Sequence, residues 1–250
     1  GFASAASVRV VPVISEFHSQ FQLPALENIN EKITSKTKAI LLCNPSNPTG
    51  YVYSKKEIDT LCELAIEHDI FLIVDEVYRE FIHDGDPHYS VMSNEKARQH
   101  TVMIDSVSKR YSMCGARVGS LVSKNNTLIQ NVLKFAHLRL SPPTYALMAS
   151  EAALSAPASY LEDVIREYTA RRNTLIKHLE QIPNVEVSHP MGAFYCIAKL
   201  PVEDAEDFSK FLLTKFSLNN QTVMMAPAKG FYSSPNVGLN EVRIAFILDQ

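Results

Sequence analysis

Several features are scarce or absent in this sequence, and each absence excludes a class of protein. Its 250 residues contain no tryptophan and only four cysteines. No two cysteines are spaced as C-x-x-C, and none lies near histidines at the spacing of a zinc site, so the sequence predicts neither a disulfide framework nor structural zinc. The histidines are scattered without a ligand pattern. We therefore expect four reduced thiols, which is typical of a cytoplasmic protein.

The sequence also lacks an excess of either charge and any long apolar run. Its net charge is −3 with both signs interspersed, so no basic surface argues for nucleic acid or an anionic membrane as a partner. No apolar segment is long enough to span a bilayer, and none resembles a signal peptide. At roughly 100–200 residues per domain, the length suits one large domain, or one with a smaller partner.

Strand-like apolar runs alternate with helical patterns over the first two thirds of the chain. This alternation predicts an α/β fold with a mostly parallel sheet and crossover helices. We expect strands at residues 8–13, 39–43, 70–74, 101–104 and 117–122. We expect helices at 26–33, 128–138, 143–154 and 158–179, and one after Ser54, where Glu57 completes a capping-box pattern.

The pattern changes after the longest predicted helix. Strands are expected at 185–188, 194–200, 222–226 and 241–247, with a helix at 205–216. This arrangement is typical of a smaller α+β domain, so we place a large domain at residues 1–170 and a small one at 171–250. Neither end resembles a natural terminus, and we expect both domains to be incomplete.

Unusual residues follow three of the predicted strands, at the edge of the sheet where open α/β folds bind ligands. After residues 39–43 the chain reads NPSNPTG, and the prolines and Gly50 predict a rigid turn that holds Asn47 stiffly. After 70–74 comes Asp75, a carboxylate that is costly to bury unless it is paired. It could cap the next helix, or face a cationic ring nitrogen with Tyr78 one turn further on as a hydroxyl donor.

The third loop combines hydroxyls and cations within 12 residues. Ser106, Ser108, Lys109 and Arg117 follow the strand at 101–104. They could form an ordinary polar loop, or an anion site, because hydroxyls and a planar guanidinium suit a phosphate. In the second case Lys109, partly desolvated, becomes a nucleophile that can form a Schiff base.

Taken together, these motifs resemble those of the class I and II aminotransferases of PLP (pyridoxal 5′-phosphate) fold type I, and most of all the aspartate aminotransferase-like branch. The resemblance covers essentially the whole chain, with matching order and intervals. It rests on Asn47-Pro48-Thr49-Gly50, on Asp75-Glu76-Val77-Tyr78, on Ser106-Val107-Ser108-Lys109 with Arg117, and on Val242-Arg243-Ile244.

The resemblance implies a role for each motif residue. Lys109 is expected to bind the cofactor aldehyde and then to move a proton between the substrate α-carbon and the cofactor. Asp75 would pair with the ring nitrogen, and Tyr78 and Asn47 would donate to the ring oxygen. The remaining assignments are Ser106, Ser108 and Arg117 at the phosphate, and Arg243, with Asn47 beside it, at the substrate α-carboxylate.

Some assignments stay open at this level. An arginine in an apolar strand can also pair with a buried acid, which is an alternative for Arg243. The segment Gly192-Ala193-Phe194-Tyr195 resembles a family segment near the substrate, but core packing of Phe194 and Tyr195 fits equally well. Family members also carry an N-terminal phosphate loop, an aromatic residue that stacks on the cofactor and a tyrosine that reaches the partner subunit, and none of these is visible here.

The expected activity is transfer of an amino group from an amino acid to a 2-oxo acid, with aspartate and 2-oxoglutarate as the expected pair. The resemblance further implies a homodimer, and the sequence indicates neither nucleic acid nor membrane as a partner. One alternative is a PLP-dependent carbon–sulfur β-lyase, which would use the same ring-binding residues. Another is a ligand-sensing, aminotransferase-like regulatory domain, which would require an additional DNA-binding domain.

Overall fold

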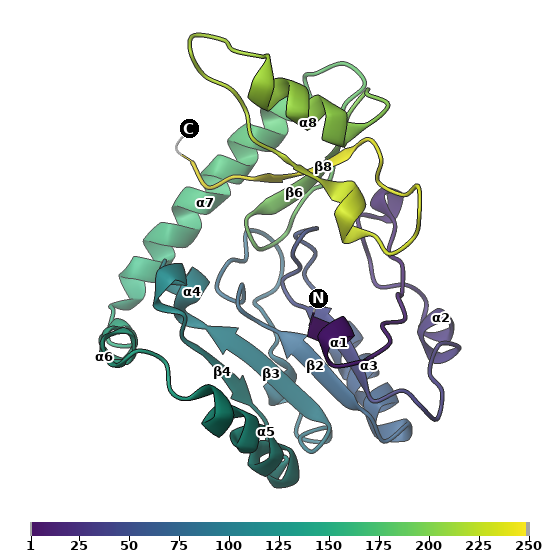
Figure 1. Ribbon diagram of the computed structural model, residues 1–250, viewed down its shortest axis with the longest axis vertical. Helices are drawn as coiled ribbons and strands as arrows, with labels where there is room; N and C mark the ends of the chain where they lie inside the picture. The colour runs from purple at the N-terminus through teal and green to yellow at the C-terminus, as the bar shows by residue number, and fades with distance from the viewer. Residues whose placement is uncertain (1, 249–250) are drawn as a thin grey trace.

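The computed structural model describes residues 2–248 and contains two separate sheets (Figure 1). The first sheet has the strand order β1 (Ala39–Cys43), β2 (Phe71–Asp75), β3 (Thr101–Ser106) and β4 (Gly119–Val122). The first three strands are parallel, and β4 is antiparallel to β3. The predicted α/β architecture with a mostly parallel sheet is therefore confirmed.

The helix α3 (Lys55–Glu67) connects β1 to β2 and covers one face of the first sheet. It begins with the predicted capping box, in which the Ser54 hydroxyl accepts from the Glu57 amide and the Glu57 carboxylate accepts from the Ser54 amide. Its apolar stripe, which includes Ile58 and Leu61, packs with Leu72 of β2 in the main core. The opposite face is less covered, since Leu41 of β1 is 72% exposed.

Most of the remaining helices lie before the strands of the first sheet, between them or directly after them in the sequence. The described residues also include α1 (Phe2–Ala5), α2 (Leu26–Asn30), α4 (Val107–Arg110), α5 (Asn126–Arg139), α6 (Thr144–Ala153), and the short 3₁₀ turns η1 (Phe17–Ser19), η2 (Val91–Ser93) and η3 (Cys114–Ala116). Within residues 2–248, no helix is long and apolar enough to cross a membrane. All four cysteines are free, as predicted, while the cytoplasmic location stays a prediction.

The second sheet is antiparallel and lies above the first in Figure 1, with α7 (Ala158–Leu179) running between the two levels. Its strand order is β5 (Glu186–Val187), β6 (Tyr195–Lys199), β8 (Glu241–Ala245) and β7 (Ala226–Pro227). The sheet forms its own core with α8 (Ala205–Thr214) and the end of α7, and η4 (Ala228–Phe231) follows β7. The predicted change of architecture is thus present, but the boundary at residue 170 falls inside α7 and stays a prediction.

Two predicted strands are wrong. Residues 8–13 form an extended coil with exposed side chains, and Val10 is 64% exposed. Of the segment 222–226, only Ala226 belongs to a strand, where it pairs with Arg243. Both segments are rich in β-branched residues, but a strand also needs a neighbour for its backbone N–H and C=O groups. Within residues 2–248 the segment 8–13 pairs with no other strand.

Candidate active site

The candidate site lies where the first three parallel strands end. The register pairs Cys43 with Asp75 and Asp75 with Ile104, so the loops after β1, β2 and β3 leave the sheet at the same edge. These loops carry Asn47, Asp75 and Lys109. The parallel register therefore brings together three polar side chains that are up to 62 positions apart in the sequence.

The loop after β1 is firmly anchored. The buried Asn44 donates its backbone N–H to the Asp75 carbonyl at 2.9 Å, and its side-chain oxygen accepts from the Tyr53 amide at 3.0 Å. Gly50 has a φ of +72°, and a Cβ there would lie 2.2 Å from Cβ of Pro190. This close approach brings the loop, with the exposed Asn47 at its tip, against the segment that leads into the second sheet.

The Lys109 amine lies beside two aromatic rings. Its Nζ is 5.7 Å from the ring centroid of Tyr78 and 5.7 Å from that of Phe194. At this distance the ring faces attract a cation. Lys109 itself is half-buried, in the short helix α4 that follows β3. The charge of the amine also lowers the pKa of Asp75.

The Asp75 carboxyl group is half-buried at the end of β2. Burial raises its pKa and the nearby Asp105 raises it further, whereas a hydrogen bond from the Val77 amide and the Lys109 charge lower it. The hydrogen bond to Val77, at 3.1 Å, shows that Asp75 does cap the local backbone, but in a turn instead of a helix. Only Oδ1 accepts this hydrogen bond, so Oδ2 of Asp75 can also contact a cationic partner.

The Tyr78 side chain is almost completely buried, with 3% exposed. Its hydroxyl oxygen is 3.0 Å from that of Tyr195, and its ring meets the rings of Phe194 and Tyr195 edge to face. Burial raises the pKa of Tyr78, and the hydrogen bond with Tyr195 adds to the effect. Tyr78 is therefore a neutral hydroxyl that can donate one hydrogen bond.

The two predicted phosphate-binding serines lie together. Their hydroxyl oxygens are 2.8 Å apart, and Ser106 also donates to the Val118 carbonyl at 2.6 Å. Arg117 immediately precedes Val118 and has a positive φ of 58°. Its exposed guanidinium donates to the Cys114 carbonyl at 2.8 Å. The backbone of Arg117 thus lies next to the serines, while its side chain points at its own turn.

Arg243 approaches the same region from the second sheet. Its Nη1 donates to the side-chain oxygen of Asn47 at 2.9 Å, across 196 positions of sequence. Its Cζ lies 4.5 Å from the ring centroid of Tyr195 and 5.0 Å from that of Phe231. Its Nε is buried and has no hydrogen-bond partner among the described residues. The guanidinium therefore contacts an amide and two rings, and the alternative of a buried acid partner is not what these contacts show.

Sequence reasoning missed an ion-pair network behind Asp75. Arg110 donates to both carboxylate oxygens of Asp105, at 3.2 and 2.9 Å, and its Nε lies 3.1 Å from Glu80. Arg79 is 3.2 Å from Asp105 as well. Two guanidinium groups therefore offset the charge of Asp105, which would otherwise raise the pKa of Asp75 more strongly. Two adjacent basic residues, Lys109 and Arg110, were the only signal in the sequence.

The arrangement as a whole combines a nucleophilic amine, a carboxylate, a neutral phenol, paired hydroxyls and a separate guanidinium fork. A lysine amine can condense with a carbonyl group, and the carboxylate can hold a protonated ring nitrogen. The guanidinium can bind a carboxylate through two parallel hydrogen bonds. These groups suit chemistry at an amine-bearing carbon next to a carboxylate.

Comparisons with known proteins agree on one family. The family model for aminotransferase class I and II matches residues 3–246. The aspartate aminotransferase of Bacillus subtilis (strain 168) is 31% identical over 232 residues, which cover 90% of this chain and 58% of that protein. The chain thus spans less than two thirds of the length of that relative.

Solved structures show the same likeness. A single mutant of the Thermus thermophilus aspartate aminotransferase superimposes with a TM-score of 0.85 at 27% identity, covering 98% of this chain and 61% of that one. The aromatic aminotransferase of Pyrococcus horikoshii OT3 superimposes with a TM-score of 0.81 at 28% identity, covering 93% of this chain and 61% of that one.

Proposed function

The chain belongs to the class I and II aminotransferases, and from this we propose that the protein transfers an amino group between an amino acid and a 2-oxo acid, with pyridoxal phosphate as its cofactor. One observation carries the proposal. The Lys109 amine lies 5.7 Å from the Tyr78 and Phe194 ring centroids and its charge lowers the pKa of Asp75, while Arg243 reaches Asn47 at the same edge from the second sheet.

The donor set fits pyridoxal phosphate. Lys109 offers the amine that the cofactor aldehyde requires. Asp75 is a partly buried carboxyl group with a raised pKa, and a cationic ring nitrogen beside it would lower that pKa again. Asn47 and Tyr78 are the residues we assign to the ring oxygen. Ser106, Ser108 and Arg117 are those we assign to the phosphate, with Arg117 turning away from Cys114. When bound, the cofactor supplies an electron sink for the negative charge that develops at the substrate α-carbon.

The protein's own residues supply position and proton transfer. Lys109 would move a proton from the substrate α-carbon to the cofactor carbon two bonds away, which is general acid–base work. The Tyr78 and Phe194 rings, whose centroids are 5.7 Å from the amine, restrict its position. Asp75 would hold the proton on the ring nitrogen, while Arg110 and Arg79 offset the charge of Asp105.

At the substrate, Arg243 binds the α-carboxylate and orients the α-carbon towards Lys109. Its fork is held by Asn47 on one side and by the rings of Tyr195 and Phe231. A guanidinium positioned before the substrate arrives loses less conformational freedom on binding. The division into a large domain at 1–170 and a small one at 171–250 is part of this proposal, with Arg243 on the small one.

We expect aspartate with 2-oxoglutarate to be the substrate pair. Relatives named for aspartate and for aromatic substrates both resemble this chain, so a panel of amino donors with 2-oxoglutarate provides the test. Aspartate should give a kcat/KM at least about tenfold above that of phenylalanine or leucine, because a site that pairs the second carboxylate of aspartate discriminates strongly against side chains without one. Turnover of aromatic or branched donors but not aspartate would overturn the pair and leave amino transfer standing.

The same assay separates amino transfer from β-elimination. Cysteine-type donors are incubated without any 2-oxo acid, and pyruvate is measured. We expect no pyruvate above the background, because amino transfer cannot turn over without an acceptor. Sustained pyruvate formation under these conditions would replace the aminotransferase proposal by a carbon–sulfur β-lyase.

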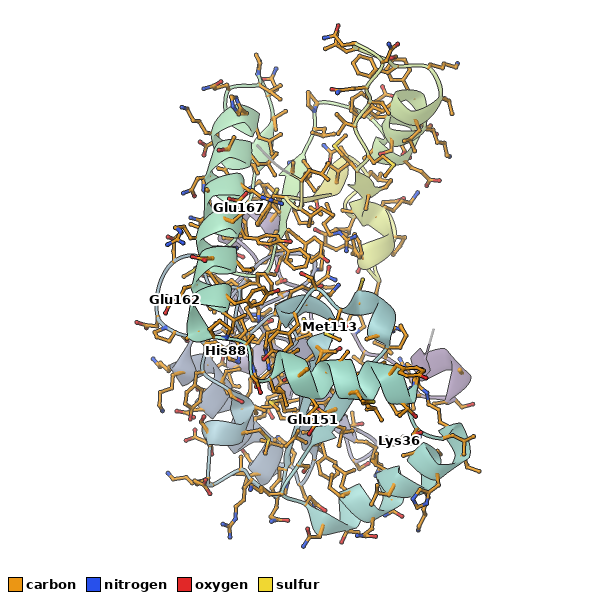
Figure 2. The ribbon with its side chains drawn as sticks, turned by 90° about the vertical axis from the view of Figure 1, so that its left-hand side faces the viewer. Lys36, His88, Met113, Glu151, Glu162 and Glu167 are labelled. Carbon is orange, nitrogen blue, oxygen red and sulfur yellow. The ribbon has the colours of Figure 1, made fainter. Side chains whose placement is uncertain are left out.

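We also propose that the protein forms a homodimer, as the family resemblance implies. The helices α5 and α6 and the segment between them expose Phe135, Leu138, Leu140, Tyr145 and Met148, and Tyr145 is 87% exposed. These helices and α7 lie on the side of the molecule that Figure 2 faces, where Glu151, Glu162 and Glu167 are labelled. Apolar surface of this extent is typical of an interface.

The oligomeric state can be measured by sedimentation equilibrium. We expect twice the chain mass for the wild type and a larger monomer fraction for Leu138→Glu, because a charge would be buried in the contact. Ile66 on α3, which is 38% exposed, offers a control position. If Leu138→Glu and Ile66→Glu behave alike, α5 and α6 are not the dimer contact.

A further inference from the structure

Tyr195 connects two parts of the proposed site that belong to different sheets. Its hydroxyl is 3.0 Å from the hydroxyl of Tyr78, which follows β2. Its ring centroid is 4.5 Å from Cζ of Arg243, which lies on β8. Tyr195 itself is on β6 and is 7% exposed. No other described contact joins Tyr78 to Arg243 through a single side chain, so Tyr195 occupies a central position.

The strand register explains how Tyr195 reaches Arg243. β6 and β8 are antiparallel, and Ile197 is the direct partner of Arg243. Tyr195 is two residues from Ile197 and therefore projects from the same face of the sheet. A residue on this face is a diagonal neighbour of Arg243, within the reach of an aromatic side chain. The ring contact is thus built into the pairing of the two strands.

The hydrogen bond between the two phenols has a direction that matters. Each hydroxyl has one proton, so in a pair one group donates and the other accepts. If Tyr78 donates to an acceptor in the site, its oxygen is left to accept from Tyr195. Tyr195 then sets the orientation of the Tyr78 hydroxyl, and a chain of two hydrogen bonds strengthens the second one.

The ring of Tyr195 has a separate effect on Arg243. A guanidinium over an aromatic face is attracted to it, and the contact also restricts the long side chain to one position. Asn47 fixes the same guanidinium through its Nη1, and Phe231 contacts it as well. The guanidinium is consequently oriented by one amide and two aromatic rings.

We propose that Tyr195 is a positioning residue that acts on both halves of the reaction site, orienting the Tyr78 hydroxyl through its own hydroxyl and the Arg243 guanidinium through its ring. This inference rests on the proposed function and extends it to Tyr195, for which the sequence had left both core packing and a place near the substrate open. Tyr195 touches no reacting atom itself. Its two contacts make two separable predictions.

Tyr195→Phe removes the hydroxyl and keeps the ring. With Tyr78 less well oriented, its hydrogen bond to the cofactor ring oxygen weakens, and the absorbance band of the bound cofactor should change at a higher pH. We expect an upward shift of about half a unit to one unit, the size of one neutral hydrogen bond. The KM values of both carboxylate substrates should stay within about twofold of the wild type, since the ring contact remains.

Tyr195→Leu removes the ring as well. The KM for both the amino acid and the 2-oxo acid should then rise about five- to thirtyfold, because both substrates use the same guanidinium. Tyr168 provides the matched control, since its ring packs on Phe194 and Phe81 in the same aromatic cluster. Tyr168→Phe should leave the pH midpoint unchanged, and Tyr168→Leu should leave both KM values within about twofold.

Each part of the proposal can fail by itself. An unchanged pH midpoint in Tyr195→Phe, in a protein where Tyr78→Phe shifts it, would remove the role of the hydroxyl. Equal KM values in Tyr195→Leu and Tyr168→Leu would remove the role of the ring. If the wild-type protein shows neither a bound-cofactor band nor amino transfer, the proposed function fails before any variant is compared.

Discussion

Replacing Lys109 by alanine is expected to abolish amino transfer and the absorbance band of the covalently bound cofactor. The amine is the one group at the end of β3 that can both condense with a carbonyl and carry the α-proton. Loss of positioned proton transfer alone costs about 10²–10⁴-fold in rate, and loss of covalent attachment adds to this. The measurements are a coupled assay with 2-oxoglutarate and a titration of the protein with pyridoxal phosphate.

Two further variants separate the nucleophile from its charge. Lys109→Arg keeps a cation near Asp75 but cannot condense with an aldehyde, so it should be as inactive as Lys109→Ala. Lys124, which is exposed after β4, provides the matched control, and Lys124→Ala should behave as the wild type. Activity in Lys109→Arg above a few per cent, or wild-type turnover in Lys109→Ala, would refute the central assignment.

Asp75→Asn is expected to lower kcat/KM by about 10²–10³-fold, because it leaves a buried ring cation without its counter-charge. Asparagine has nearly the same shape and can still accept from the Val77 amide, so the turn after β2 should remain. The comparison variant is Asp105→Asn, which lies in the network with Arg110 and Arg79 and removes a charge that raises the Asp75 pKa. Equal losses in the two variants would contradict a direct contact between Asp75 and the cofactor.

The same substitution should have the opposite effect on the stability of the cofactor-free protein. Burial raises the pKa of Asp75 in the folded state, so its contribution to stability is present below the pKa of the unfolded chain, about 4, and is lost as the pH rises through the folded value. At pH 7 the folded protein holds a poorly solvated carboxylate. Asp75→Asn should therefore unfold at a higher temperature than the wild type at pH 7 and at a similar temperature below pH 4.

Asp204 is the control for the direction in which stability changes with pH. It precedes α8, where hydrogen bonds from the Asp207 and Glu206 amides lower its pKa. Its contribution is present above the unfolded pKa and lost as the pH falls through the folded value. Asp204→Ala should consequently lower the unfolding temperature at pH 7. A lower unfolding temperature for Asp75→Asn at pH 7 would show that Asp75 stabilises the fold instead of serving the site at a cost.

The local pattern of the sequence was sufficient for the elements that depend on local forces. β1 and α7 begin and end where periodicity placed them, and the capping box of α3 is present. The order of the polar loops after β1, β2 and β3 was enough to predict one edge of the sheet as the site, because parallel strands end together. These features follow from propensity, period and capping, which act within a few residues of one another.

Only the tertiary structure decided which residues from distant segments of the chain contact one another. It left residues 8–13 without a strand partner, placed Arg110 and Arg79 around Asp105, and set Tyr195 between Tyr78 and Arg243. Such contacts join groups up to 196 positions apart, as for Asn47 and Arg243. Their energies depend on distance, burial and orientation in the folded chain, and no residue carries these quantities by itself.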